Sequence, residues 1–138
     1  MHKRILLPFD GSKYSEAALK EAIAMAKFSK GQIVIVTVVD VTEQFEALAP
    51  ELTEKMAEHA KELVNRAAEK ASAAGIKVEK EVHVGDAYEV IVDVAKRKNI
   101  DLIVMGSHGR RGLTRLLMGD VTAKVVGHAP CTVMVVRA

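Results

Sequence analysis

The sequence predicts a single α/β domain built on one parallel β-sheet. Short apolar runs alternate with helix-length amphipathic segments along the whole chain, which is the pattern of strand–helix–strand units with right-handed crossovers. Several runs are almost continuously apolar, as in strands that are buried on both faces of a parallel sheet. A chain of 138 residues fits one domain, and no boundary or repeat divides it, so we expect one domain over residues 1–138.

The apolar runs predict five strands of two kinds. Ile5–Leu7, Ile33–Val39 and Leu102–Met105 are nearly continuous and predict strands buried on both faces. Between Ile76 and Val84 apolar and charged residues alternate, which indicates one solvated face and a strand at a sheet edge. The run from Thr132 to Val136 is almost wholly apolar. If it forms the other edge, a second copy of the chain is its simplest cover, so we expect a homodimer through this strand.

The segments between these strands predict helices with recognisable ends, over about 12–28, 50–75, 86–98 and 121–127. Ser12 or Ser15 is the expected N-cap of the first helix. Asp86 and Glu89 have the spacing of a capping box at the start of the third. The basic triplet 96–98 is expected to be the end of that helix on a solvated face rather than a binding patch.

Composition excludes several classes of protein. Twenty basic against eighteen acidic residues give a net charge of only +2, and aromatic residues make up 4% with no Trp, so nucleic acid is not an expected partner. The single cysteine, Cys131, excludes an internal disulfide and fits a reducing compartment; we expect it to be a small apolar residue rather than a reactive thiol. No apolar run is long enough for a signal peptide or a membrane span, which predicts a cytoplasmic protein without membrane insertion.

The most informative segment is the glycine-rich stretch from Gly106 to Asp120. It directly follows the fourth strand, at the carboxyl edge where open parallel sheets bind ligands. Glycines allow backbone N–H groups to approach an anion closely, and a helix that starts near Gly119 adds its positive end. The segment therefore predicts a site for a phosphate or nucleotide.

Known catalytic and nucleotide motifs are otherwise missing from the sequence. There is no P-loop lysine, no dinucleotide-binding glycine motif after the first strand, and no nucleophile elbow. The five histidines are scattered and Cys131 has no partner at zinc spacing, so no metal cluster is expected. His108 is the only placed candidate for a general base, and a loop histidine is more often solvated than catalytic. Met56 and His59 are expected to be core and surface residues without a functional role.

One family has all of these features in this order. Gly106 and Gly109, followed after nine residues by Gly119, occur together with Pro8-Phe9-Asp10 after the first strand and His-Ala-Pro-Cys before the last. Along its whole length the chain resembles the universal stress protein family. The resemblance implies a doubly wound, Rossmann-like sheet of five parallel strands in the order 3-2-1-4-5, with helices on both faces. It also implies adenine nucleotide at the carboxyl edge and homodimers paired through the last strands.

The resemblance also implies particular site residues. Asp10 and the backbone of Val38 would hold the adenine, Pro8 and Phe9 would shape the pocket, and Gly106 would lie against the ribose. Gly109, Gly119 and the start of the fourth helix would hold the phosphates. The complete predicted nucleotide site is Pro8, Phe9, Asp10, Val38, Met105, Gly106, His108, Gly109, Arg110, Gly119, Asp120, Val121 and Thr122.

Asp120 departs from the nucleotide-binding pattern of the family, which has Ser or Thr at this position. As an N-cap, its carboxylate would accept hydrogen bonds from backbone N–H groups near Thr122 and Ala123 that a phosphate would otherwise use. At about 4 Å from a phosphate, the carboxylate would weaken phosphate binding by up to about 4 kcal/mol at an effective dielectric near 20. Each exposed arginine would offset only about 0.2 to 1 kcal/mol of this repulsion. A bound Mg²⁺ would instead make Asp120 a metal ligand.

The sequence therefore leaves three hypotheses. The first is a non-catalytic regulatory dimer that binds an adenine nucleotide, ATP before others, with or without Mg²⁺. The second is an interaction protein of the same fold that binds no physiological nucleotide. The third is a slow ATPase, for which His108 is the candidate base.

Overall fold

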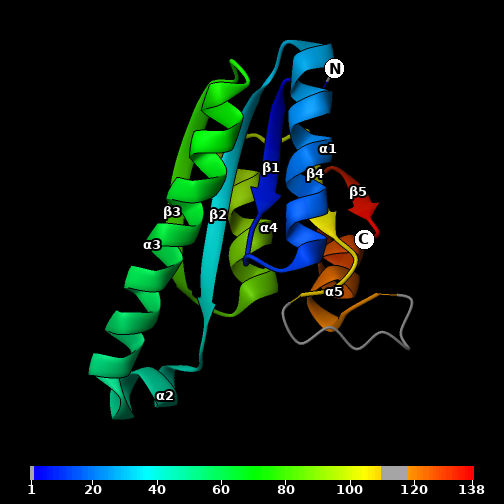
Figure 1. The fold of residues 1–138 in the computed structure, drawn as a ribbon. Coiled ribbons are helices and arrows are strands. Elements are labelled where there is room, and N and C mark those ends of the chain that lie inside the picture. Colours follow the sequence, from blue (N-terminus) through cyan, green and yellow to red (C-terminus); the bar gives the residue numbers. More distant parts are fainter. Residues whose placement is uncertain (1, 110–117) are drawn as a thin grey trace.

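The computed structural model describes residues 2–109 and 118–138, and its five parallel strands form one sheet in the order β3-β2-β1-β4-β5 (Figure 1). This order and the parallel pairing confirm the predicted fold. The elements in chain order are β1 (Arg4–Pro8), α1 (Lys13–Ser29), β2 (Gln32–Asp40), α2 (Glu43–Leu48), α3 (Pro50–Ala73), β3 (Val78–Gly85), α4 (Ala87–Arg97), β4 (Leu102–Gly106), α5 (Asp120–His128) and β5 (Thr132–Val136).

The helices cover the sheet in two layers. One hydrophobic core joins α1 and α3 to one face of the sheet, and a second core lies against α4 on the other face, with Val125 of α5 (Figure 1). Alternate residues of β1 divide between the cores, since Ile5 and Leu7 belong to the first and Leu6 to the second. The strand order reverses between β1 and β4, and the loops after these two strands therefore diverge and open a crevice at the carboxyl edge.

The predicted helix ends are partly correct. Ser12 is the N-cap of α1, and its Oγ accepts a hydrogen bond from the backbone N of Ser15 at 3.1 Å. Asp86 occupies the N-cap position of α4, but its side chain makes no capping hydrogen bond, so the predicted capping box is wrong. The short helix α2 was not predicted because it buries no residue and therefore has no apolar face to detect.

The sheet has a step at its carboxyl edge. β1 ends at Pro8, which is paired with Val36, whereas β2 continues to Asp40 and remains paired with β3 as far as Gly85. The side chain of Thr37, at the start of this extension, donates a hydrogen bond of 2.7 Å to the backbone oxygen of Phe9. The β2–β3 extension therefore forms a wall beside the end of β1.

Both predicted edge strands lie at the edges of the sheet. β5 is paired on one side with β4, and Val133 to Val136 are only partly buried. Cys131, just before β5, is also partly buried, and burial, with a smaller contribution from Asp101, raises the pKa of its thiol. This direction disfavours a reactive thiolate. No helix among residues 2–109 and 118–138 combines the length and apolarity of a membrane span.

Charged side chains on β3 and α4 form a network around Glu81, whose side chain is 15% exposed. Glu81 Oε1 lies 2.9 Å from Nη2 of Arg97 and 2.6 Å from Nε2 of His83, and Oε2 lies 3.5 Å from Nζ of Lys98. Burial raises the pKa of Glu81, but the hydrogen bonds from Arg97 and His83 outweigh it and lower the pKa to about 2. The basic triplet 96–98 ends α4, as predicted, but Arg97 and Lys98 pair with Glu81 and do not simply face solvent.

We expect this network to stabilise the protein in a pH-dependent way. Because the pKa of Glu81 is lower in the folded than in the unfolded state, its contribution is complete above about pH 4.5 and is lost as pH falls towards 2. Because the basic partners of Glu81 are partly exposed to solvent, which screens the interaction, we expect the network to contribute about 1–2 kcal/mol to the free energy of unfolding. Denaturant unfolding should show Glu81→Gln less stable than wild type by this amount at pH 7, with the difference shrinking below pH 4.5. A difference that stays constant from pH 7 to 3 would contradict this explanation, and the exposed Glu69→Gln is the matched control.

Candidate functional site

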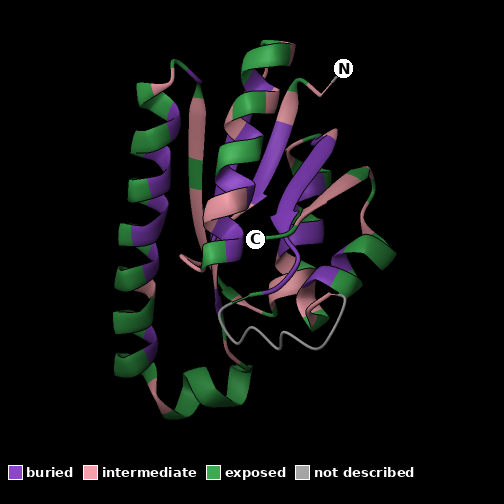
Figure 2. Cartoon of the chain, turned by 45° about the vertical axis from the view of Figure 1, so that its right-hand side comes forward, coloured by how far each residue is buried: buried purple, intermediate pink, exposed green. Residues whose placement is uncertain are grey.

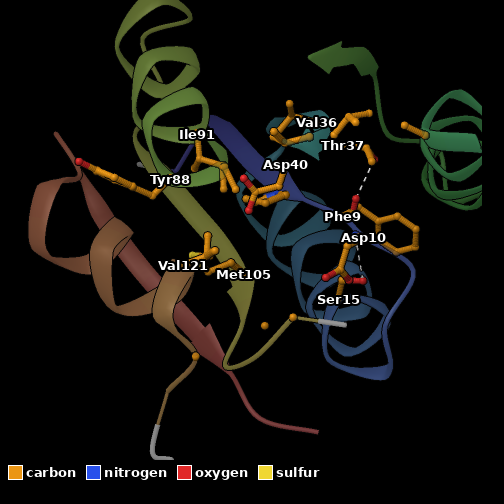
Figure 3. A pocket seen from close by; sticks show the side chains of 18 of the residues that line it. Phe9, Asp10, Ser15, Val36, Thr37, Asp40, Tyr88, Ile91, Met105 and Val121 are labelled. Carbon is orange, nitrogen blue, oxygen red and sulfur yellow. Dashed lines mark hydrogen bonds between the residues drawn. The ribbon is translucent and has the colours of Figure 1, made fainter. Parts of the chain in front are cut away.

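A cavity of about 850 Å³ lies at the carboxyl edge of the sheet, between the ends of β1, β2 and β4 and the start of α5 (Figure 3). All predicted site residues that the structure describes line it, and Arg110 lies outside the described residues. The residues brought together are Pro8, Phe9, Asp10, Val38, Met105, Gly106, His108, Gly109, Gly119, Asp120, Val121 and Thr122. Figure 3 shows side chains from several elements around this space, among them Asp10 in the loop after β1, Ile91 of α4, Met105 of β4 and Val121 of α5.

The loop after β1 fixes Asp10 at the cavity wall. Its Oδ1 accepts a hydrogen bond of 2.9 Å from the backbone N of Ser12, which closes a tight turn. Gly11 within the turn has φ +82°, a conformation that favours glycine. The backbone N of Asp10 also donates to Oγ of Ser15, at 3.3 Å (Figure 3). Asp10 is therefore both a turn residue and a cavity-lining carboxylate.

The glycines after β4 meet the start of α5 without side chains between them. The backbone N of Gly119 donates a 2.7 Å hydrogen bond to the oxygen of Ser107. A Cβ on Gly119 would lie 3.3 Å from Cα of His108, and a Cβ on Gly109 would lie 3.2 Å from Oδ2 of Asp10. Gly109 thus lies next to the Asp10 carboxylate, and Gly119 brings the start of α5 against the backbone of residues 107–109.

Gly106 has a packing role that the sequence did not reveal. A Cβ at this position would lie 2.6 Å from Cβ of Tyr14 and 2.8 Å from its backbone carbon, so β4 can pass under the first turn of α1 only without a side chain. The buried hydroxyl of Thr122 donates a 2.9 Å hydrogen bond to the oxygen of Gly106 and ties α5 to the end of β4. Both residues line the cavity and also hold its walls together.

His108 is buried rather than solvated, contrary to the expectation for a loop histidine. It is 7% exposed, its Nδ1 lies 3.0 Å from Oγ of Ser107, and its ring centroid lies 5.1 Å from that of Tyr14. The contacts with Tyr14 and Ser107 hold the ring in place. The imidazole is thus fixed in the cavity wall.

Asp120 is exposed and is the first residue of α5, not its N-cap. Gly119 holds the cap position because its N–H is fixed on Ser107, and its carbonyl accepts the first helical hydrogen bond, from Ala123 at 2.9 Å. The predicted capping role of Asp120 is therefore wrong. An acidic residue in the first helical turn is still favourable, by about 0.3–1 kcal/mol.

The described part of the cavity is rich in carboxylates. Asp10, Asp40, Asp86 and Asp120 line it, against Lys55 and Lys124. The described residues contain no group of three or more His, Cys, Asp and Glu placed to hold a metal ion.

Several lining residues were missed by sequence reasoning. Lys55, Met56 and His59 come from α3, and Tyr88 and Ile91 from α4. Met56 is 37% exposed, so the expectation that it is a core residue is wrong. Helical spacing placed it on the apolar face of α3, but beyond the end of β1 this face borders the cavity instead of the core. The step in the sheet could not be predicted from the sequence pattern.

Comparisons with known proteins agree with this architecture. The model of the universal stress protein family matches residues 1–137. A universal stress protein of Methanocaldococcus jannaschii is 36% identical over 142 residues, covering 99% of this chain and 83% of the relative. The solved structure of a universal stress protein from Lactobacillus plantarum is 32% identical, with a TM-score of 0.88 and coverage of 99% and 98%.

A third similar protein was solved with a ligand. The crystal structure of a universal stress protein in complex with cAMP is 25% identical, with a TM-score of 0.72, and covers 99% of this chain and 97% of that one. The family match and the 36% identical relative both extend over almost the entire sequence. This chain therefore belongs to the universal stress protein family.

Proposed function

We propose that this protein binds an adenine nucleotide, ATP before others, in the cavity at the carboxyl edge of its sheet. The observation that carries the proposal is that Asp10, Gly109 and Gly119, from separate segments of the chain, line one cavity of about 850 Å³. A volume of this size is within the range of small-molecule sites. The cAMP complex of a similar family member supports an adenine nucleotide as the ligand class.

The two parts of the cavity suit the two ends of a nucleotide. Val36, Ile91 and Met105 are buried apolar side chains that would pack against a purine, with the Asp10 carboxylate as an acceptor for its amino group. The backbone of Gly109 and the first turn of α5 would receive phosphate oxygens, since free N–H groups at a helix start bind anions. The resemblance likewise assigns Asp10 to the base and Gly109, Gly119 and the start of α5 to the phosphates.

Asp10→Ala tests this orientation of the base. Loss of a hydrogen bond to a charged acceptor is expected to weaken ATP, ADP and AMP alike, by about 10- to 100-fold, because the contact is with the shared adenine. Titration calorimetry measures all three. Asp86→Ala removes another exposed carboxylate from the cavity rim and is the matched control, with affinity expected within about twofold of wild type. Wild-type affinity in Asp10→Ala would place the base elsewhere.

We infer further that the nucleotide regulates the protein and is not turned over. His108 lies in the cavity wall, but its Nδ1 is engaged with Ser107 and its ring with Tyr14, which suits a structural role. We expect no nucleotide hydrolysis above background, and His108→Ala should leave any residual phosphate release unchanged. Loss of a measurable activity in His108→Ala, with folding intact, would instead support a slow ATPase.

The regulatory form is proposed to be a cytoplasmic homodimer paired through β5. Support comes from the place of β5 at the sheet edge and from the partial exposure of its apolar residues. Sedimentation equilibrium measures the mass directly, and Val135→Lys should convert a dimer to monomers because it puts a charge on the pairing strand. A monomeric wild type would contradict this part of the proposal.

The exposed Asp120 favours a second candidate function. Its carboxylate at the start of α5 opposes a phosphate at the position where the helix would best bind one. On this alternative the protein acts by contacts with other proteins and binds no physiological nucleotide. Absence of binding at millimolar ATP, ADP and AMP with Mg²⁺ distinguishes it from the first proposal.

A further inference from the structure

Exposed apolar side chains gather at one corner of the molecule, away from the strand edges. Four of the seven large apolar residues exposed among the described residues lie on α2 and the first turns of α3, namely Phe45, Leu48, Leu52 and Met56. Leu48 is 86% exposed and Leu52 50%. Figure 2 shows α2 and the start of α3 as mostly exposed, and Figure 1 shows them projecting beyond the sheet. We name these four residues the α2–α3 corner.

The corner is surrounded by negative charge. Residues 43–58 contain one basic side chain, Lys55, and five acidic ones, Glu43, Glu46, Glu51, Glu54 and Glu58. All five glutamates are exposed, and none takes part in an ion pair within the part of the chain that the structure describes. Elsewhere on the molecule, Glu16 and Glu81 are paired with lysine or arginine. The corner therefore combines an apolar centre with an unneutralised acidic rim.

Core packing does not account for the two most exposed residues of the α2–α3 corner, Leu48 and Leu52. α2 buries no residue, so Leu48 contributes nothing to the core. The N-terminus of α2 is capped by Thr42, whose Oγ1 accepts a hydrogen bond from the backbone N of Phe45 at 3.0 Å. A helix that is held by a cap and exposes Phe and Leu has the composition of a contact surface, with apolar centre and polar rim.

We propose that the α2–α3 corner is a docking surface for a basic amphipathic helix of a partner protein. The leucines would pack against the apolar side of that helix, and its lysines or arginines would face the five glutamates. The same glutamates repel an anionic membrane surface, which favours a protein partner. The corner shares only Met56 with the lining of the proposed nucleotide cavity, and the inference does not rest on nucleotide binding.

The test uses the full-length protein and a synthetic helix of roughly 18 residues with leucines at i, i+3 and i+4 spacing and lysines elsewhere. One control peptide has the same composition in an order without helical amphipathicity, and another has glutamate in place of lysine. Fluorescence anisotropy measures binding at low and high salt. We expect saturable binding of the first peptide alone, weakened by salt.

Two pairs of substitutions locate the binding. The double substitution Leu48→Ser and Leu52→Ser is expected to weaken peptide binding at least about tenfold. The control is Phe28→Ser, which should not change the affinity; Phe28 is 89% exposed and lies near the end of α1. Glu46→Lys with Glu51→Lys should weaken binding and reduce its salt dependence, whereas Glu69→Lys on the far end of α3 should not. If the variant with both serine substitutions fails to fold, the variant with both lysine substitutions still tests whether the peptide binds at this corner.

Other outcomes overturn the proposal. Equal binding of the control peptides, or wild-type affinity in both substituted pairs, excludes a basic amphipathic helix at this corner. Sedimentation that shows larger assemblies of the wild type, reduced by the serine pair, assigns the corner to a second copy of the chain. Binding to phosphatidylcholine vesicles that the serine pair abolishes assigns it to a lipid surface.

Discussion

Gly106→Val is expected to lower the free energy of unfolding by about 3 kcal/mol, at the upper end of the cost of overpacking a core. The reason is steric, since a Cβ at residue 106 would lie 2.6, 2.8 and 2.9 Å from three atoms of Tyr14, two of them in the backbone. Tyr14 cannot move away alone because it lies in the first turn of α1 beside Ser12. Denaturant unfolding measures the loss, and Gly106→Ala should give a smaller loss in the same direction.

Gly127→Ala is the matched control for this prediction. A Cβ at residue 127 would meet nothing within 4 Å, and the residue lies within α5. Alanine is a better helix former than glycine by about 0.8–1 kcal/mol in a helix interior and by less at the next-to-last residue of α5, so this variant should be about as stable as wild type or slightly more stable. Equal stability of Gly106→Val and wild type would show that β4 and α1 separate easily. In that case the contact with Tyr14 would not explain the glycine.

Asp120→Ser is expected to tighten ATP by more than about tenfold and AMP by much less. The carboxylate lies at the start of α5, where the outer phosphates would approach, and a charge about 4 Å away costs up to about 4 kcal/mol at an effective dielectric near 20. AMP places less charge there than ATP. Titration calorimetry of both ligands, with and without Mg²⁺, measures the difference.

Asp120→Asn separates charge from the serine hydroxyl. If repulsion dominates, Asn and Ser variants should tighten ATP similarly, whereas a larger gain with Ser indicates a hydrogen bond from its hydroxyl. Equal gains for ATP and AMP would contradict a gate at the outer phosphates. A loss of ATP affinity that appears only with Mg²⁺ would instead make Asp120 a metal ligand.

The fold was predictable because its signals are local and repeated. Continuous apolar runs such as Ile33–Val39 and Leu102–Met105 predict strands covered on both faces, and the alternating third strand predicts an edge. The structure confirms both expectations. α2 escaped prediction because its apolar residues face solvent, so they give no core-facing period. The strand order came from the family resemblance.

The site was predictable only in part. The positions of Asp10, Gly109 and Gly119 follow from which strands end at the carboxyl edge, and the structure brings them together. The contribution of α3 through Met56 and His59 depends on β2 continuing past β1, a step that no sequence pattern encodes. The contact of Gly106 with Tyr14 joins residues far apart in the chain. Gly106 was predicted as a ligand contact, and the structure adds a second reason for glycine there, which is the close packing of β4 against α1.

The most direct test of the proposed function is titration calorimetry of the nucleotide-free wild-type protein with ATP, ADP and AMP, each with and without Mg²⁺. Before titration, ultraviolet absorbance and mass spectrometry of the denatured protein establish that no nucleotide remains bound. The proposed function predicts saturable heat with one adenine nucleotide per chain, and no heat with the guanine counterparts at the same concentration. No binding of any adenine nucleotide at millimolar concentration would contradict it.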